Sequence, residues 1–475
     1  MKISRTVNFK VLLIGCLARF FMFYYYWYIP RRHVAGSLIA NEYPYHWTMI
    51  NLLAGPGKDI QALSQCAYIH VHSKSPNDIL PLSSSLFCES LSHALTAMSI
   101  YVPSNVVGFT VSVLSDYHQL VIISFILQLT SFFLMTSLED EHISDEMACH
   151  SREDKKILEN ENVHRCANNQ LSFASSVYWL NPAIMFGMLL SPLPFITHML
   201  ILVSLRSAVE SRRQNRRKSC IIAAVFMLLT CLCSFVLVCI SPQFFILVPA
   251  LMVLLSKRGY IDMYNDDFSM NRFTFALTMY AVLLGCAQFW LNLDPISHLK
   301  RHMYGQDIHS YSPSISFSWY LCVQIFEENK DFYARLLYLQ PFIFMVPLLI
   351  RLYSWSLEIL YILIAILFMY KPDTTICDII FVFCVLMLNF RHVFIHVKYL
   401  SVLLVLILIP LVSSPVMLYL WVDLGTANAN YFFFQSLMMW ASYAMLIVQY
   451  TKALVLREQQ NAQRNHSDRT VLFEY

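Results

Sequence analysis

Charged residues and glycine are scarce in this sequence of 475 residues: 13% are charged and 10 are glycine, whereas 57% are hydrophobic. Soluble domains carry roughly 25% charged residues, so about half of the usual solvent-facing chemistry is missing. Long apolar stretches recur instead, and a membrane-spanning helix needs about 20 mostly apolar residues. The composition therefore excludes a soluble globule and indicates an integral membrane protein.

The apolar stretches also lack the apolar–polar alternation that is typical of β-barrel strands. Because backbone groups in hydrocarbon must bond within the protein, helices are then the remaining way to cross the bilayer. We predict an all-α polytopic membrane protein with a single transmembrane domain over residues 1–475. It has about twelve transmembrane helices, near residues 9–29, 108–137, 170–190, 193–209, 219–240, 242–256, 272–293, 333–352, 354–370, 375–393, 399–421 and 431–453.

The basic residues determine the predicted orientation, because loops rich in Lys and Arg face the cytosol. The densest basic loop contains Arg206, Arg212, Arg213, Arg216, Arg217 and Lys218. With this loop in the cytosol, residues 138–169 form a charged cytosolic insert, which we expect to be disordered, and residues 454–475 a cytosolic tail. The luminal side carries a loop over 30–107 with an interfacial helix and a loop over 294–332 with an amphipathic helix.

The sequence lacks signs of catalysis: it has no nucleophile motif, P-loop or glycine-rich nucleotide fingerprint. A membrane glycosyltransferase would present acidic side chains in a luminal loop, where a carboxylate deprotonates the acceptor or holds a divalent metal. Glu42, Asp59 and Asp78 are isolated there, and the pair Asp266–Asp267 lies on the predicted cytosolic side. We therefore expect no enzyme activity, cofactor or metal, and the net charge of +3 is too small to indicate a nucleic-acid partner.

Three ionisable residues fall within or close to apolar stretches, where charge is costly. Arg19 lies inside the first predicted span, at a cost of at least ~2.5 kcal/mol near the bilayer centre. It either extends to the membrane surface or pairs with a phosphate or an internal acid. Glu358 and Asp378 are expected to face the interior of the helix bundle.

Two predicted luminal segments suit ligand binding. In residues 312–332, aromatic residues such as Trp319 and Phe326 are interspersed with polar ones such as Glu327. This pattern predicts an amphipathic helix on the membrane surface, either as part of a site or as a simple anchor. The small residues of 423–430 carry Asn428 and Asn430, which can bind a sugar or phosphate head group or cap the last span.

The same segments resemble a known family. SPSISFSWYLCVQIFE at 312–327 resembles the signature of the PIG-U family, a subunit of the glycosylphosphatidylinositol (GPI) transamidase, which reads approximately TPNxGLFWYFFxEMFxxF. GTANANYF at 425–432 is similar to the family's GSANSNFF, and YWLNP at 178–182 resembles its YLLNP. The sequence departs from the signature at Ser314 and Ser316, where the family has Asn and Gly.

The resemblance implies a scaffold like that of GT-C type lipid-linked glycosyltransferases, without their catalytic acids, in the endoplasmic reticulum membrane. It implies a non-catalytic subunit that binds and presents the GPI lipid on the luminal side during attachment of GPI anchors to proteins. The implied partners are a caspase-like catalytic subunit, PIG-T-like and PIG-S-like subunits and a metallopeptidase-like subunit. The expected GPI-binding residues are Asn428, Asn430, Trp319, Phe326 and Glu327.

One alternative function remains at this stage. A dolichol-phosphate-mannose-dependent mannosyltransferase of GPI biosynthesis would have a similar architecture. It would require Glu42, Asp59 or Asp78 as a catalytic acid.

Overall fold

The computed structural model describes residues 10–21, 117–153, 173–190, 193–216, 219–257, 268–290, 313–316, 318–371, 374–389, 393–422 and 424–473. Within these ranges every regular element is a helix, and extended backbone pairs only in an isolated bridge between Lys257 and Phe268. The predicted all-α class is therefore confirmed for the described part. The chain begins with a helix over 10–21. The labelled helices are α6 (Tyr117–Glu153), α8 (Phe173–Leu180), α9 (Pro182–Leu190), α10 (Leu193–Arg216), α11 (Cys220–Ile240), η3 (Pro242–Ile246), α12 (Leu247–Ser256), α13 (Met270–Trp290), α15 (Ser318–Gln324), α16 (Glu327–Arg351), α17 (Ser356–Tyr370), α18 (Ile376–Met387), η5 (Phe394–His396), α19 (Leu400–Val422) and α20 (Ala429–Phe473).

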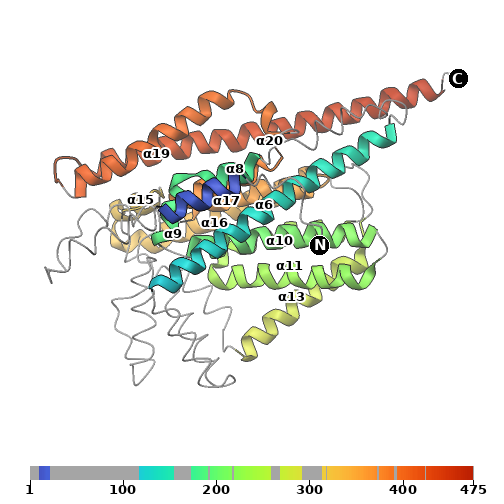
Figure 1. Ribbon diagram of the computed structural model, residues 1–475, viewed down its shortest axis with the longest axis horizontal. Coiled ribbons are helices and arrows are strands. Elements are labelled where there is room, and N and C mark those ends of the chain that lie inside the picture. The colour runs from blue at the N-terminus through green and yellow to red at the C-terminus, as the bar shows by residue number, and fades with distance from the viewer. Residues whose placement is uncertain are drawn as a thin grey trace.

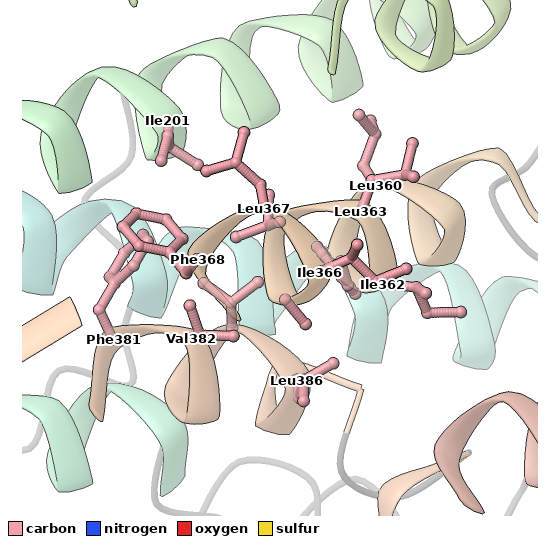
Figure 2. Close-up of a cluster of buried hydrophobic side chains, with 14 of the residues drawn as sticks. Ile201, Leu360, Ile362, Leu363, Ile366, Leu367, Phe368, Phe381, Val382 and Leu386 are labelled. Atoms are coloured by element: carbon pink, nitrogen blue, oxygen red, sulfur yellow. The ribbon is translucent and has the colours of Figure 1, made fainter. Parts of the chain in front are cut away.

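Helix α17 forms the centre of the bundle. Beyond Ser356 and Glu358 in its first turn, its residues are apolar or aromatic on every side, which is typical of a helix surrounded by other helices, and residues 356–368 are all buried. Figure 2 shows its Leu367 next to Ile201 of α10, and its Phe368 next to Phe381 of α18. Figure 1 places the α19–α20 hairpin along the upper edge of the molecule, with α10 and α11 below the centre.

The outermost hairpin contrasts with this centre. Only 17% of the most apolar stretch of α19 is buried by other parts of the described structure. The helix packs mainly against α20. Its outward face consists of large apolar side chains, as expected where a helix meets lipid rather than water. These exposed residues are Val402, Val405, Leu408, Ile409, Val412 and Val416.

Four helical segments are long and apolar enough to cross a membrane: Val121–Asp140, Cys220–Val238, Leu400–Val422 and Ala429–Gln460. Three shorter apolar helical segments, Pro242–Ser256, Ser356–Tyr370 and Ile376–Met387, coincide with further predicted spans. A membrane protein is thus supported. The count of twelve and the GT-C type scaffold stay predictions, and the loop predicted for 30–107 lies entirely outside the described residues.

Helix α6 extends further than we predicted. It continues through Glu153, so the first half of the charged insert is helical, and the expected disorder is wrong for these residues. The reason lies partly in Glu139, which is buried and accepts hydrogen bonds from the N–H of Ala174 (2.7 Å) and the hydroxyl of Ser175 (2.9 Å). A carboxylate is stabilised there because the first N–H groups of α8 have no partner within that helix.

The predicted span 170–190 is divided into α8 and α9 at Asn181–Pro182. The amide oxygen of Asn181 accepts a hydrogen bond from the N–H of Ala183 (2.9 Å), which caps the start of α9. Proline fits the first position of a helix because it has no N–H to leave unpaired. The break in this span is therefore encoded by two adjacent residues.

The predicted amphipathic helix is also divided. A short α15 ends at Gln324, and α16 starts at Glu327 and runs to Arg351. Glu327 therefore begins a long helix rather than lying within the surface helix. At the other end of the chain, α20 continues through most of the predicted tail, to Phe473.

Cationic side chains gather at the ends of several helices. Arg272 donates hydrogen bonds to the carbonyl of Lys257 (3.1 Å) and the hydroxyl of Ser211 (3.0 Å). Lys257 in turn donates to the carbonyl of Ser354 (3.2 Å). We call this group, together with the ion pair Arg351–Glu458 (2.8 Å), the basic end of the bundle. Residues 429 and 458 of α20 are roughly 44 Å apart at 1.5 Å per residue, so the α19–α20 connection lies far from it.

Candidate functional site

The connection between α19 and α20 is a compact turn over residues 424–430. Gly425 adopts a positive φ of 63°, which glycine tolerates because it has no Cβ. The N–H of Thr426 then returns to the carbonyl of Leu420 (3.0 Å), which ends α19. We call this turn, with Trp319 and Tyr320 of α15, the asparagine rim.

Both predicted asparagines lie exposed at the start of α20. The amide oxygen of Asn428 accepts a hydrogen bond from the N–H of Asn430 (3.4 Å). This is the interaction of an N-cap residue with the second residue of its helix, so the capping interpretation of Asn428 is confirmed. The amide oxygen of Asn430 accepts a hydrogen bond from the hydroxyl of Tyr320.

Stacked aromatic rings hold α15 against this turn. The Trp319 ring is buried and stacks on Trp421 at the end of α19, with centroids 5.9 Å apart and planes at 24°. The Tyr320 ring stacks on Phe433 of α20, with centroids 4.1 Å apart and planes at 16°. Because these rings come from three helices, they give the exposed amides a packed support.

The structure brings together three of the five predicted site residues. Asn428, Asn430 and Trp319 belong to the rim, and Tyr320, which we did not predict, joins them. Phe326 is 83% exposed, and its carbonyl accepts a hydrogen bond from the N–H of Asn329 (2.9 Å) at the start of α16, away from the rim. The backbone of Glu327 starts α16, and its side chain lies outside the described part of the structure. The aromatic run around Trp319 was the only sequence signal for Tyr320.

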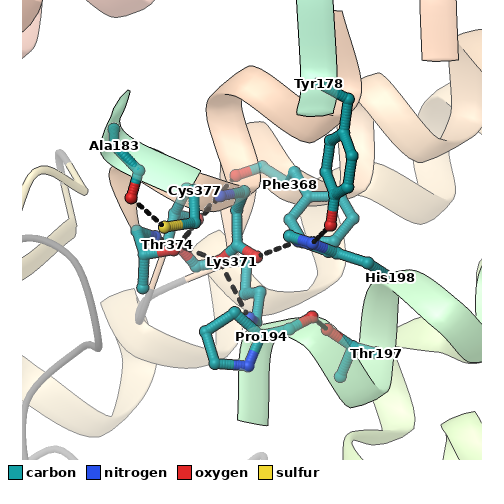
Figure 3. Close-up of polar contacts among 11 residues, drawn as sticks. Tyr178, Ala183, Pro194, Thr197, His198, Phe368, Lys371, Thr374 and Cys377 are labelled. Atoms are coloured by element: carbon teal, nitrogen blue, oxygen red, sulfur yellow. Dashed lines mark hydrogen bonds and ion pairs between the residues drawn. The ribbon is translucent and has the colours of Figure 1, made fainter. Parts of the chain in front are cut away.

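A second polar cluster, which we call the buried junction, joins α8, α10, α17 and α18. His198 Nε2 and Asp378 Oδ1 are 2.8 Å apart, and both side chains are 0% exposed. Lys371 Nζ lies 3.4 Å from Asp378 Oδ2, and Tyr178 Oη lies 3.4 Å from His198 Nδ1. Figure 3 shows Tyr178, His198 and Lys371 converging. The His198 ring also stacks on Phe381, at 4.0 Å and 7°.

Asp378 also caps the start of α18. Its Oδ2 accepts a hydrogen bond from the N–H of Thr375 (3.0 Å), and its own N–H donates to Thr375 Oγ1 (3.1 Å). These reciprocal bonds form the capping box that starts α18. The expected interior position of Asp378 is confirmed, and so is that of Glu358, whose carboxylate accepts a hydrogen bond from Asn389 (3.1 Å).

Among the residues that the structure describes, Arg19 pairs with no acidic side chain. Its guanidinium is 1% exposed, donates to the carbonyl of Trp179 (2.8 Å) and the amide oxygen of Gln128 (2.9 Å), and lies 3.6 Å above the Trp179 ring. It therefore does not extend to the membrane surface. The last carbonyls of α8 carry partial negative charge, which stabilises the cation. Helix α8 thus has Glu139 at its start and Arg19 at its end.

These arrangements differ in what they can do chemically. The buried junction is closed to solvent and satisfies its charges internally, whereas the rim offers exposed amides. Among the residues that the structure describes, no group of three or more His, Cys, Asp and Glu side chains is placed to hold a metal ion. The rim is therefore the candidate binding site.

The family model described as "PIG-U: GPI transamidase subunit PIG-U" matches residues 77–439, well over half of the chain. The chain belongs to the PIG-U family. The matched range of this chain includes both the asparagine rim and the buried junction.

Three curated relatives carry related descriptions. The chain is 26% identical over 219 residues to the "GPI transamidase component GAB1 homolog" of Schizosaccharomyces pombe, covering 46% of this chain and 53% of the relative. It is 27% identical over 218 residues to the "GPI-anchor transamidase component PIGU" of Homo sapiens, covering 44% and 49%. It is 25% identical over 149 residues to the "GPI transamidase component GAB1" of Saccharomyces cerevisiae, covering 31% and 38%. The chain therefore spans about half the length of the first two relatives that it matches.

Proposed function

We propose that this chain is a non-catalytic subunit of the GPI transamidase complex in the endoplasmic reticulum membrane, and that its asparagine rim holds the GPI lipid on the luminal side. Membership of the PIG-U family and the names of its relatives support the place in the complex. The observation that carries the lipid-binding role is the pair of exposed amides on a packed aromatic support. The partners are a caspase-like catalytic subunit, PIG-T-like and PIG-S-like subunits and a metallopeptidase-like subunit.

The chemistry of the rim suits a glycolipid. Each hydrogen bond from an amide contributes about 0.5–1.5 kcal/mol net, and more against a charged group. The apolar outer face of α19 runs along the same helix away from the turn, from Val416 to Val402, and offers a surface for acyl chains. Exposed aromatic residues such as Phe326 and Tyr431 suit the level of lipid head groups, where aromatic side chains are enriched.

The distribution of charge supports the luminal placement. The basic end contains Lys257, Arg272 and Arg351, and positively charged helix ends face the cytosol. Helix α20 runs from the rim to this end over roughly 44 Å, which exceeds the ~30 Å hydrocarbon core of a bilayer. The rim is then on the opposite side, in a bundle of about twelve membrane-spanning helices.

The direct test replaces both amides, Asn428→Ala with Asn430→Ala, in cells that lack their own PIG-U-type subunit. Loss of two hydrogen bonds of about 1 kcal/mol each weakens lipid binding about 30-fold. We expect reduced surface display of GPI-anchored reporters, accumulation of complete unattached GPI, and normal co-purification of the other subunits. Asn271→Ala is the matched control, because this exposed amide lies at the start of α13, next to the basic end.

Two results would overturn the proposal. Normal display after the double replacement would exclude the rim as the lipid site. Loss of a mannosylated precursor after replacing Glu42, Asp59 and Asp78 by alanine would instead favour a mannosyltransferase; these three residues lie outside the described part of the structure.

A further inference from the structure

The connection between α18 and α19 has one side that packs on the bundle and another that faces outward. Phe394 and Val397 are buried, and the Phe394 ring packs edge-on against Phe383 of α18, with centroids 5.5 Å apart and planes at 81°. These contacts hold the connection on the end of α18. Ile395 and Tyr399 lie on the outward side, with 55% and 74% of their surfaces exposed.

Tyr399 has a backbone conformation that tyrosine rarely adopts. Its φ is 59°, in the left-handed region where the Cβ crowds the backbone and a bulky residue is strained. Gly425, beyond the other end of α19, has a similar φ but no Cβ. The strain at Tyr399 is not offset by packing, because its side chain has no hydrogen-bond or ring partner among the described residues. Strain at an exposed residue indicates a function for the direction of its side chain.

The exposed polar side chains next to Tyr399 are basic. Lys398 and His396 are both exposed, and the side chain of neither forms a hydrogen bond or an ion pair with another described residue. The sequence over 389–400 contains no Asp or Glu, so the connection itself supplies no carboxylate to neutralise Lys398. We call the four outward-facing residues the cationic turn: Ile395, His396, Lys398 and Tyr399.

The cationic turn lies where α19 enters the membrane. The exposed apolar side of α19 begins at Val402, three residues after Tyr399. From there the helix continues for roughly 34 Å at 1.5 Å per residue, which exceeds the ~30 Å hydrocarbon core of a bilayer. The turn and the asparagine rim are therefore at opposite membrane surfaces. Aromatic side chains are enriched at this level, and basic ones there attract anionic head groups.

We propose that the cationic turn binds an anionic phospholipid, such as phosphatidylserine or phosphatidylinositol, in the leaflet opposite the asparagine rim. Lys398 and an N–H of His396 contact the phosphate, while Tyr399 and Ile395 lie at the boundary between head groups and acyl chains. A lipid fits better than an acidic protein because the apolar side chains beside Lys398 lead directly into the lipid-facing side of α19. This second lipid site goes beyond the proposed function.

The test uses purified transamidase complex that contains the full chain, in nanodiscs of phosphatidylcholine with a small fraction of phosphatidylserine. The phosphatidylserine carries a photoreactive group on its acyl chain, close to the head group. After illumination, mass spectrometry measures the lipid attached to peptides of the cationic turn. We expect at least about 5-fold more attachment than with an equally labelled phosphatidylcholine, because one basic residue near the surface contributes about this factor.

Lys398→Gln should lower the attachment of phosphatidylserine about 5-fold and leave that of phosphatidylcholine unchanged. Arg213→Gln is the matched control. It removes a positive charge whose side chain is 33% exposed from α10, which lies below the centre of the bundle in Figure 1, away from α19. This control should change attachment at the cationic turn by less than about 2-fold, because exposed charges further apart than about 10 Å are screened.

Tyr399→Gly separates lipid contact from packing. Glycine adopts a positive φ without strain, so the unfolding temperature in detergent without anionic lipid should not fall. Attachment of phosphatidylserine should nevertheless decrease at least about 3-fold, because the ring no longer buries apolar surface in the lipid. A ring that served only to pack on the protein would give the reverse result, a lower unfolding temperature with unchanged attachment.

Four results would overturn the proposal. They are equal attachment of the two phospholipids, equal losses in Lys398→Gln and Arg213→Gln, full displacement of phosphatidylserine by inorganic phosphate, and attachment to the isolated chain but not to the complex. The third would indicate a site for a free anion, and the fourth a contact with a partner subunit. Retention of the GPI lipid should be normal in Lys398→Gln, so this proposal and the proposed function can fail independently.

Discussion

The buried junction and the asparagine rim both place polar side chains in a bundle made mostly of apolar helices, but they do so in opposite ways. His198 and Asp378 are wholly buried, and their polar atoms bond to one another and to neighbouring helices. Asn428 and Asn430 are exposed, and within the described part of the structure each side-chain amide accepts one hydrogen bond through its oxygen. In this molecule a buried polar group joins helices, whereas an exposed one is accessible to a ligand.

The largest effect should follow from Asp378→Ala at the buried junction. The variant removes the acceptor of His198, the charge beside Lys371 and the cap of α18 together. Removing one partner of a buried charge pair costs about 3–5 kcal/mol, so folded protein should be scarce in cells and unfold early in a denaturant titration in detergent. Asp378→Asn retains an acceptor for the cap of α18, so its free energy of unfolding should fall by less. If Asp378→Ala folded normally but failed to retain lipid, the contrast between the two regions would be wrong.

Trp319→Ala tests whether the rim depends on its buried support. Replacing a buried Trp costs about 3 kcal/mol, and the α15 platform with Trp421 and Phe432 would lose its central ring. Both the free energy of unfolding and lipid retention should fall. The exposed Phe326 provides the control, because Phe326→Ala should change the free energy of unfolding by no more than about 0.5 kcal/mol. If Trp319→Ala and Phe326→Ala lowered the free energy of unfolding equally, this description of the rim would be contradicted.

Gly15→Ala tests the clamp on α8. A Cβ at this position would lie 1.9 Å from Trp179 Nε1, so the helix over 10–21 would have to move away from α8. Overpacking of this kind costs about 1–3 kcal/mol, and Arg19 would be displaced from the end of α8. At Gly285, inside α13 and five residues before its end, an added Cβ meets no atom within 4 Å, so Gly285→Ala should instead stabilise the protein by about 0.5–1 kcal/mol. Thermal unfolding of both variants in detergent would reveal whether their effects have opposite signs.

The smallest effect should come from Glu458→Gln at the basic end. Its ion pair with Arg351 spans 2.8 Å, but the Arg351 side chain is 55% exposed. Pairs of this kind contribute about 0–1 kcal/mol and are screened by salt. The difference in unfolding temperature from the unmodified protein should be small in low salt and vanish at about 1 M salt. A large, salt-independent loss would show that the basic end behaves like the buried junction.

Local sequence patterns predicted the helices more reliably than the contacts between them. The span expected at 219–240 is observed as Cys220–Ile240, and that at 399–421 as Leu400–Val422. Length and apolar character are properties of contiguous residues, so these boundaries follow directly from the sequence. The prediction of disorder was wrong for residues 138–153 of the charged insert, partly because the contact of Glu139 that favours the helix comes from α8, 35 residues away.

Contacts between residues far apart in the chain could not be predicted from the sequence. His198 and Asp378 are separated by 180 positions, and neither has a neighbour in the sequence that identifies its partner. The pairing of Tyr320 with Asn430 spans 110 positions. Residue types alone could mark Asn428 and Asn430 as candidate ligands, but not the direction in which their amides point.

By itself the sequence determined that this protein is helical, resides in a membrane and resembles the PIG-U family, because scarcity of charge, apolar length and short motifs are all readable along the chain. Only the tertiary structure decided which polar residues are enclosed and which face outward. That decision depends on the packing of helices far apart in the sequence, since the same Asp or Asn becomes a helix junction or an open donor according to the side chains that surround it.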